Sequence, residues 1–334
     1  MASDTPSAAP APQQAAAHPA NIRASRSFAP SEQIALAILV AALVAAPFAI
    51  YPFFLMQALC FALFACAFNL LVGYVGLLSF GHAMFLGLAS YVSAHAAKVW
   101  GLTPELAILA GVVAASLLGV IVGALAIRRQ GIYFTMTTLA LSQMLFFFCL
   151  EAPFTHGEDG IQSVPQGKLF GFIDLSREMT LYGFVVIVFL AGFLIIHRTI
   201  NSPFGEILKA IRENEPRAIS LGYRTERYKL AAFVLSAGLA GLAGGLKAIV
   251  AQNASLNDVH WSMSGEVVLM TLVGGLGTVF GPIVGAFTII AMQNYLAGLG
   301  SWVTVIQGVI FVICVLTFRR GVIGEIANLI GRPL

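Results

Sequence analysis

Hydrophobic residues along this chain gather into runs of about 20 residues that short polar segments separate. A helix needs about 20 apolar residues to cross the hydrocarbon core of a bilayer, which is about 30 Å thick. A membrane β-barrel would instead alternate over segments of about 10 residues, and this pattern is not found here. The sequence therefore predicts an all-α polytopic membrane protein of about ten transmembrane helices, over 34–50, 53–72, 78–97, 106–127, 132–150, 181–197, 229–251, 266–279, 281–298 and 302–318.

Glycine and proline predict breaks in some of these helices. One cluster ends the second range and a similar cluster separates the eighth range from the ninth, where a tight hairpin or a broken helix is expected. The first cluster is Gly73, Gly76, Phe80 and Gly81, and the second is Gly274, Gly277, Phe280 and Gly281. Two related halves would suit a transporter, although small residues at this spacing also serve helix packing.

The amino-acid composition agrees with a membrane protein and indicates where the transmembrane domain begins and ends. Hydrophobic residues make up 59% of the 334 residues, above the roughly 45–50% of soluble domains. Residues 1–30 are rich in Ala, Pro and Gln and are expected to form a disordered cytoplasmic tail. The transmembrane domain is expected over 31–320, with a first helix that is not cleaved as a signal peptide, and a second cytoplasmic tail over 321–334.

The distribution of basic residues predicts the orientation. If the amino terminus is cytoplasmic, fourteen of the 18 Lys and Arg residues fall on the cytoplasmic side and three on the outer side, which is the bias expected of inner loops. We therefore expect a multi-pass protein of a bacterial inner membrane with both termini in the cytoplasm. The formal net charge of +3 then indicates orientation and not a nucleic-acid partner.

The longest predicted cytoplasmic loop, residues 198–229, contains the most charged run of the chain. Ser202 is expected to cap a first helix that has Pro203 in its first turn. Ile207, Leu208 and Ile211 fall on one face of this helix. The stripe suits a groove on a partner protein or a position against the membrane headgroups, and the pattern alone favours neither.

A second short helix is expected after a turn at Glu215, because Pro216 disfavours helical backbone in the residue before it. It would run from Arg217 to Leu221 and stop at Gly222.

Polar residues inside the predicted spans are neutral. No Asp or Glu lies in the middle of a span, which argues against a proton-driven transporter with buried carboxylates. Taken together, the neutral set could line a pathway for a zwitterion, while each residue alone is better explained by helix packing or by bonds to its own helix. The candidates are Asn69, His82, Thr135, Thr138, Ser142 and Gln143.

Other chemistry is not indicated by the sequence. The four cysteines lie in apolar runs without a disulfide or metal spacing, and no catalytic residue or metal ligand is proposed. There is no Gly-x-x-x-x-Gly-Lys-Ser/Thr sequence, so the chain is expected to bind no ATP itself. The outer loop 151–180 is acidic, which suits either a docking face or a solvated cap.

Three segments resemble the permease subunits of branched-chain amino acid ABC importers, particularly the LivM-like half of the permease pair. They are NLLVGYVGLLSFGHAMFLGLASY at 69–91, SPFGEILKAIRENEPRAISLGYRTERYKLAAFVLSAGLAGLAGGL at 202–246 and LVGGLGTVFGPIVGAF at 272–287. THGEDGI at 155–161 is similar to a Thr-Gly-Gly-x-x-Gly turn of that family, with His156 in place of the first Gly. The resemblance, from about residue 34 onward, implies the ABC importer permease fold.

The resemblance also implies that the loop 198–229 is the counterpart of the coupling helix that docks on the ATPase subunit. Glu215, Ala218 and Gly222 match the importer pattern of Glu-Ala-Ala, three residues and Gly, with the spacing off by one and one Ala missing. The residues expected in the ATPase-coupling loop are Gly205, Glu206, Ile207, Leu208, Ala210, Ile211, Arg212, Glu213, Glu215, Ala218 and Gly222.

The family further implies a second homologous permease, two ATPase subunits that bind ATP and Mg, a periplasmic substrate-binding protein and membrane lipid as partners. The expected function is import of branched-chain or other neutral amino acids. Two alternatives stay open: a secondary transporter of small neutral solutes, and a permease of this family for urea, amides or small carboxylates. A membrane-embedded enzyme is a distant third interpretation, because no nucleophile, base or metal set is visible.

Overall fold

The computed structural model describes residues 30–300, 302–317 and 321, so the predicted tails 1–30 and 321–334 lie outside the described residues except for residues 30 and 321. Each of the ten predicted ranges overlaps one helix: α1 (Pro30–Ala45), α2 (Pro52–Asn69), α3 (Ala83–Lys98), α4 (Pro104–Ala126), α5 (Ile132–Glu151), α6 (Glu178–Ile200), α9 (Thr225–Val250), α10 (Trp261–Gly274), α11 (Gly281–Tyr295) and α12 (Trp302–Thr317). Between α6 and α9 lie the short helices α7 (Pro203–Glu213) and α8 (Glu215–Ser220).

Five helical segments within the described residues are long and apolar enough to cross a membrane: Pro52–Val75, Pro104–Ala126, Ile132–Glu151, Glu178–Ile200 and Thr225–Val250. The first joins α2 to a π-helical turn, η2 (Leu70–Val75). Short α10 and α11 form the expected hairpin, with 14 and 15 residues, or about 21–22 Å each at 1.5 Å per residue. The exact number of spanning helices therefore does not follow from helix length alone.

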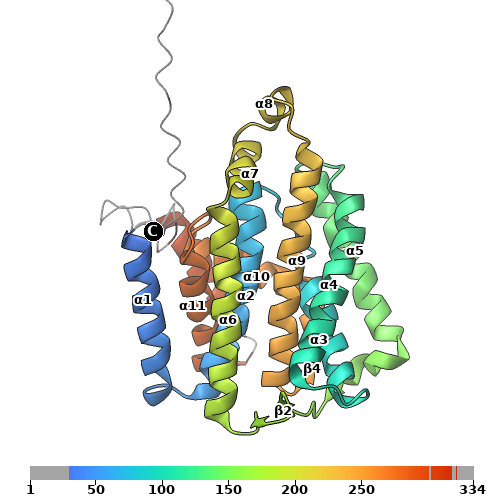
Figure 1. Cartoon of the computed structure of the whole chain (residues 1–334), viewed down its shortest axis with the longest axis vertical. Coiled ribbons are helices and arrows are strands. Elements are labelled where there is room, and N and C mark those ends of the chain that lie inside the picture. The colour runs from blue at the N-terminus through green and yellow to red at the C-terminus, as the bar shows by residue number, and fades with distance from the viewer. Residues whose placement is uncertain (1–29, 301, 318–320, 322–334) are drawn as a thin grey trace, which may run out of the picture.

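Helices α2 and α9 occupy the centre of the bundle (Figure 1). Within the apolar 18-residue stretch of each helix, 94% of the residues are buried in the α2 segment and 83% are buried in α9. Helices α3 and α4 pack on α9, while α2 also contacts α6, α10 and α11. The buried share is only 39% in α4, 28% in α5 and 39% in α6. These helices therefore present apolar faces to the bilayer or to other subunits.

The two long loops lie at opposite ends of the bundle (Figure 1). Helices α7 and α8 stand at the end where α1 begins. The loop 151–180 lies at the other end and contains η3 (Pro153–Thr155), η4 (Gly157–Asp159), β1 (Ile161–Gln162), β2 (Lys168–Leu169) and β3 (Ile173–Asp174). Strand β1 pairs antiparallel with β4 (Asn253–Ala254), which follows α9, and β2 pairs antiparallel with β3.

Several predicted helix ends are displaced, for local reasons. Helix α1 stops at Ala45 and continues as the 3-10 turn η1 (Ala46–Phe48), because Pro47 cannot donate a backbone hydrogen bond. Helix α3 starts at Ala83 and not near residue 78, since the chain turns through Gly76 with φ 81°. Helix α10 starts at Trp261, after the uncommon cap His260, whose Nδ1 accepts from the Ser262 N–H at 3.3 Å.

Candidate functional site

The two glycine clusters, far apart in the sequence, lie against each other in the structure. Asn69, at the end of α2, donates from Nδ2 to the Thr278 carbonyl at 2.8 Å and accepts from the Gly277 N–H through Oδ1 at 3.0 Å. A Cβ at Gly73 would stand 2.8 Å from the Gly277 nitrogen, so only glycine permits this approach. Asn69 thus satisfies backbone groups that the α10–α11 turn leaves without helical partners.

Arg212 connects the α7 helix to this junction. Its Nη1 donates to the Gly73 carbonyl, and its side chain packs beside Gly76 and Gly277. Because the donor is a guanidinium group, this is a charge-assisted hydrogen bond. The loop helix, the end of α2 and the α10–α11 turn therefore meet at one point, which we call the break junction: Asn69, Gly73, Arg212, Gly277 and Thr278.

The prediction that Leu208 and Ile211 present an outward stripe is wrong. Both side chains are buried within this chain, and Leu208 belongs to the main hydrophobic core. The helix itself begins as predicted, with Ser202 Oγ accepting from the Gly205 N–H at 3.3 Å and Pro203 in the first turn. An amphipathic stripe packs equally well against its own protein, and here α7 uses it to lie on η2, α6 and α9.

The exposed apolar residues of the loop belong to α8 and the turn that follows. Ile219 is 55% exposed, Leu221 69% and Tyr223 40%, and none of them was among the predicted coupling residues. Helix α8 starts at Glu215, capped by Asn214 Oδ1 accepting from the Arg217 N–H at 3.0 Å, and the turn ends it at Gly222 with φ 89°.

The remaining predicted loop residues divide by exposure. Glu215 does not face outward: its carboxylate accepts from Lys229 Nζ of α9 at 2.6 Å and from Gln130 Nε2 at 3.0 Å, so it holds α8 to the bundle. Lys209 pairs with Glu206 at 2.9 Å on the surface. Glu206, Ala210, Arg212, Glu213 and Gly222 are exposed, Ile207 and Glu215 are half-buried, and Gly205, Leu208, Ile211 and Ala218 are buried.

His82 is a packed polar group, as one of the sequence interpretations expected, but only one of its ring nitrogens is paired: Nδ1 is buried and has no hydrogen-bond partner among the described residues. The side chain is fully buried, and its Nε2 lies 2.9 Å from Ser236 Oγ of α9. Ser236 in turn donates to the Ala67 carbonyl of α2. The imidazole stands among four phenylalanine rings, Phe64, Phe68, Phe85 and Phe233. This arrangement joins α2, α3 and α9 at the centre of the bundle.

The polar side of α5 faces the chain that precedes α3. Thr135 Oγ1 donates to the Leu78 carbonyl at 3.0 Å, and Thr138 Oγ1 bonds its own helix at the Thr135 carbonyl at 2.8 Å. Thr138 and Ser142 are buried, Thr135 and Gln143 are half-buried, and Ser142 Oγ has no hydrogen-bond partner among the described residues. Thr135 and Thr138 therefore lie beside the segment that leads to His82, at Leu78 and Gly81, whereas Asn69 lies in the break junction.

A buried ion pair at the opposite end of the bundle was not predicted from the sequence. Lys247 Nζ of α9 contacts both carboxylate oxygens of Asp258, at 2.8 and 2.7 Å, and also Asn253 Oδ1 at 3.3 Å. Asp258 lies in η5 (Leu256–Asp258) and forms a capping box with Ser255. The position of Lys247 near the end of an apolar helix could have indicated this pair, because a charge at such a place needs a partner.

Tyr91 of α3 was also not among the residues predicted from the sequence. Its hydroxyl is buried and has no hydrogen-bond partner among the residues that the structure describes, so it is a further candidate for contact with water or solute. Within the same residues, no group of three or more His, Cys, Asp or Glu side chains is placed to hold a metal ion.

Comparison with known proteins supports the family resemblance. Residues 50–315 match the family model described as branched-chain amino acid transport system / permease component. The high-affinity branched-chain amino acid transport system permease protein LivM of Escherichia coli K12 is 26% identical over 279 residues, which cover 76% of this chain and 65% of that protein. No solved structure matches the chain.

Two proteins of Methanocaldococcus jannaschii are also similar. Its probable branched-chain amino acid transport permease protein LivM is 26% identical over 196 residues, covering 56% of this chain and 55% of that protein. Its probable permease protein LivH is 26% identical over 232 residues, covering 63% and 69%. The family model spans most of the chain and includes the break junction, the α7–α8 loop and the central helices α2 and α9. The chain therefore belongs to the family of permease components of branched-chain amino acid transport systems.

Proposed function

We propose that this chain is a transmembrane permease subunit of an ATP-driven ABC importer for branched-chain or other neutral amino acids. In this proposal about ten helices lie in the bacterial inner membrane, with both termini and the α7–α8 loop on the cytoplasmic side. Two ATPase subunits bind ATP and Mg and dock on the loop. A periplasmic binding protein delivers the solute at the face of the loop 151–180.

The break junction is the observation that supports coupling most directly. Helix α7 is joined to the Gly73 carbonyl through Arg212, and Asn69 joins the same region to the α10–α11 turn. A partner that displaced the loop would therefore act on two interrupted helices at once, without an intermediate flexible segment. Movement of packed elements around such breaks is a common basis of switching in transporters.

A second permease is expected because an importer with two ATPases needs two coupling loops, and the described part of this chain offers one, the α7–α8 loop. The similarity to both a LivM and a LivH protein is consistent with a pair of homologous permeases. Purification of the complex expressed with its neighbouring genes should recover two permease chains and two ATPase subunits. An active chain recovered without any nucleotide-binding partner would instead support the secondary transporter.

The expected cargo is a neutral, mainly aliphatic amino acid. The candidate pathway residues are neutral. The expectation that no Asp or Glu lies in the middle of a span is wrong for Glu266: α10 begins at Trp261, so Glu266 lies within this helix, half-buried, and its Oε2 accepts from Gln293 Nε2 of α11 at 3.0 Å. We expect Leu, Ile or Val to stabilise the associated binding protein in a thermal shift screen and to stimulate ATP hydrolysis in proteoliposomes. Stabilisation by urea or a dicarboxylate, with none by these amino acids, would refute the cargo assignment alone.

Replacing Thr135 and Thr138 together with valine is expected to weaken uptake modestly, with the complex still assembled. Each neutral hydrogen bond is worth about 0.5–1.5 kcal/mol, and valine keeps the shape of threonine. Uptake of labelled amino acid by the reconstituted complex measures the effect. Thr137→Val on the same helix is the matched control, because among the described residues Thr137 Oγ1 bonds only the Tyr133 carbonyl of its own helix, at 2.7 Å. An equal loss in the control would remove α5 from the pathway.

A further inference from the structure

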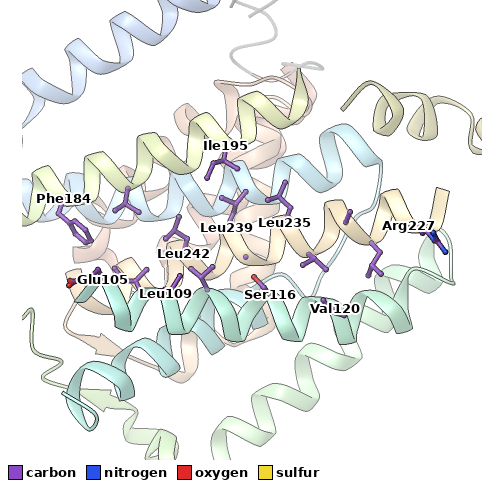
Figure 2. Close-up of a pocket in the computed structure, with 17 residues that line it drawn as sticks. Glu105, Leu109, Ser116, Val120, Phe184, Ile195, Arg227, Leu235, Leu239 and Leu242 are labelled. Atoms are coloured by element: carbon purple, nitrogen blue, oxygen red, sulfur yellow. The ribbon is translucent and has the colours of Figure 1, made fainter. Parts of the chain in front are cut away.

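A long apolar groove opens on the side of the bundle between α4 and α6, with α9 as its floor (Figure 2). It encloses about 890 Å³. Figure 2 shows Glu105 and Phe184 near one end and Arg227 at the other, with Leu109, Val120, Leu235 and Leu239 along it. On α9 it extends from Arg227 to Leu242, fifteen residue steps or about 22 Å. The groove is therefore longer than one leaflet of hydrocarbon, about 15 Å.

At its Arg227 end the groove continues into a second, more polar cavity of about 430 Å³. Arg227 and Ala231 line both cavities. The second cavity adds Arg224 and an aromatic wall in which Phe204 and Tyr223 each pack on Tyr228, with ring centroids 5.8 and 6.2 Å apart. Aromatic rings beside basic residues are typical of the membrane–water interface.

Both arginines are available to a ligand. Arg224 and Arg227 are exposed, and among the described residues neither guanidinium group forms an ion pair or a side-chain hydrogen bond. Two cations at the mouth of an apolar groove complement a molecule with an anionic head and an apolar chain. Basic pockets between membrane helices at the bilayer surface bind phospholipid headgroups in this way.

We propose that this composite groove, lined by Arg224, Arg227, Tyr228, Ala231, Val234 and Leu235 at its basic end, is a binding site for an anionic phospholipid. The phosphate lies between the two guanidinium groups, and an acyl chain lies along α9, between α4 and α6. A single phospholipid places its phosphate at the bilayer surface, where the arginines lie, and its acyl chain in the hydrocarbon region, where the groove is apolar. A partner helix filling the groove would instead have to place an acidic residue against the arginines. The site adjoins the turn between α8 and α9, so lipid bound here touches the loop proposed for coupling.

The test measures which lipids the full-length chain retains. The protein is reconstituted with equimolar phosphatidylglycerol and phosphatidylcholine of identical acyl chains, extracted in mild detergent and examined by native mass spectrometry. Each arginine near an anionic surface favours binding by about fivefold, so retention of phosphatidylglycerol should exceed that of phosphatidylcholine by roughly tenfold or more. Equal retention of the two lipids by the unaltered chain would overturn the proposal.

Charge variants locate the site. Arg224→Gln with Arg227→Gln should remove the preference, whereas Arg224→Lys with Arg227→Lys should keep much of it and shows that the pair tolerates substitution. Arg128→Gln with Arg129→Gln is the matched control, since these exposed arginines follow α4 at the same end of the molecule but do not line the groove. A loss of preference equal in the control would indicate general surface charge and overturn the assignment.

Steric variants test the apolar part separately. Ala231→Trp should fill the groove and lower retention of both lipids, while Ala124→Trp, exposed on α4 outside the groove, should not. Retention unaffected by Ala231→Trp would exclude an acyl chain from the groove. Cross-linking of Ala231→Cys to a second permease chain in the assembled complex would also overturn the lipid assignment, because a protein helix would then occupy the groove. None of these outcomes depends on ATP-driven transport, so they are separate from the proposed function.

Discussion

Replacing Ile219 and Leu221 together with aspartate is expected to abolish ATP-driven uptake and substrate-stimulated ATP hydrolysis, while the chain stays folded. These side chains are 55% and 69% exposed, so the change removes little burial within this chain. If they dock in a groove of the ATPase, the complex loses about 1.5–3 kcal/mol of apolar burial per side chain and places two unpaired charges in the interface. Uptake and ATPase assays in proteoliposomes measure the result.

The matched control for this experiment lies in the same loop. Leu208→Asp introduces the same charge at a fully buried position, so it should lower the yield of folded chain and not selectively the coupling. Size-exclusion profiles and thermal unfolding distinguish the two variants. Normal uptake and ATP hydrolysis by the Ile219→Asp, Leu221→Asp variant would remove α8 from the docking surface and leave the family assignment untouched.

Lys247→Met is expected to lower the free energy of unfolding by about 3–5 kcal/mol, because it leaves the Asp258 carboxylate buried without its cation. The side chains of Lys247 and Asp258 are only 10% and 4% exposed. Thermal and denaturant unfolding of the purified chain in detergent measures the loss. Lys98→Met is the matched control: Lys98 Nζ donates to the Gln162 carbonyl at 2.7 Å in an exposed contact, so its loss should cost about 1 kcal/mol or less.

The double variant Lys247→Met, Asp258→Leu tests the reason for that loss. It removes the pair together and should be more stable than Lys247→Met alone, although it also loses the cap on η5, worth about 1 kcal/mol. Asp258→Leu alone completes the comparison. If the losses in the free energy of unfolding of Lys247→Met and of Asp258→Leu simply add in the double variant, the carboxylate and the ammonium group do not stabilise each other and the prediction fails.

The break junction shows how much of the candidate site could be predicted from the sequence. The sequence predicted both glycine breaks, and it included Asn69 and Arg212 among the candidate residues. It placed them in different roles, one in a pathway and one in a coupling loop. The structure joins them, because Gly73 and Gly277 permit two backbones to approach and Asn69 bonds across the gap.

By itself the sequence determined the helical class, the approximate positions of ten helices, the Ser202 cap and the turn at Gly222, since apolar run length, capping side chains and backbone preferences act within a few residues. Only the tertiary structure decided which faces are covered. Leu208 and Ile211 form the same apolar stripe whether they meet a partner or their own core, and Lys247 finds Asp258 only because the chain after α9 folds back over it. Burial and pairing depend on what lies opposite a side chain, which no local pattern specifies.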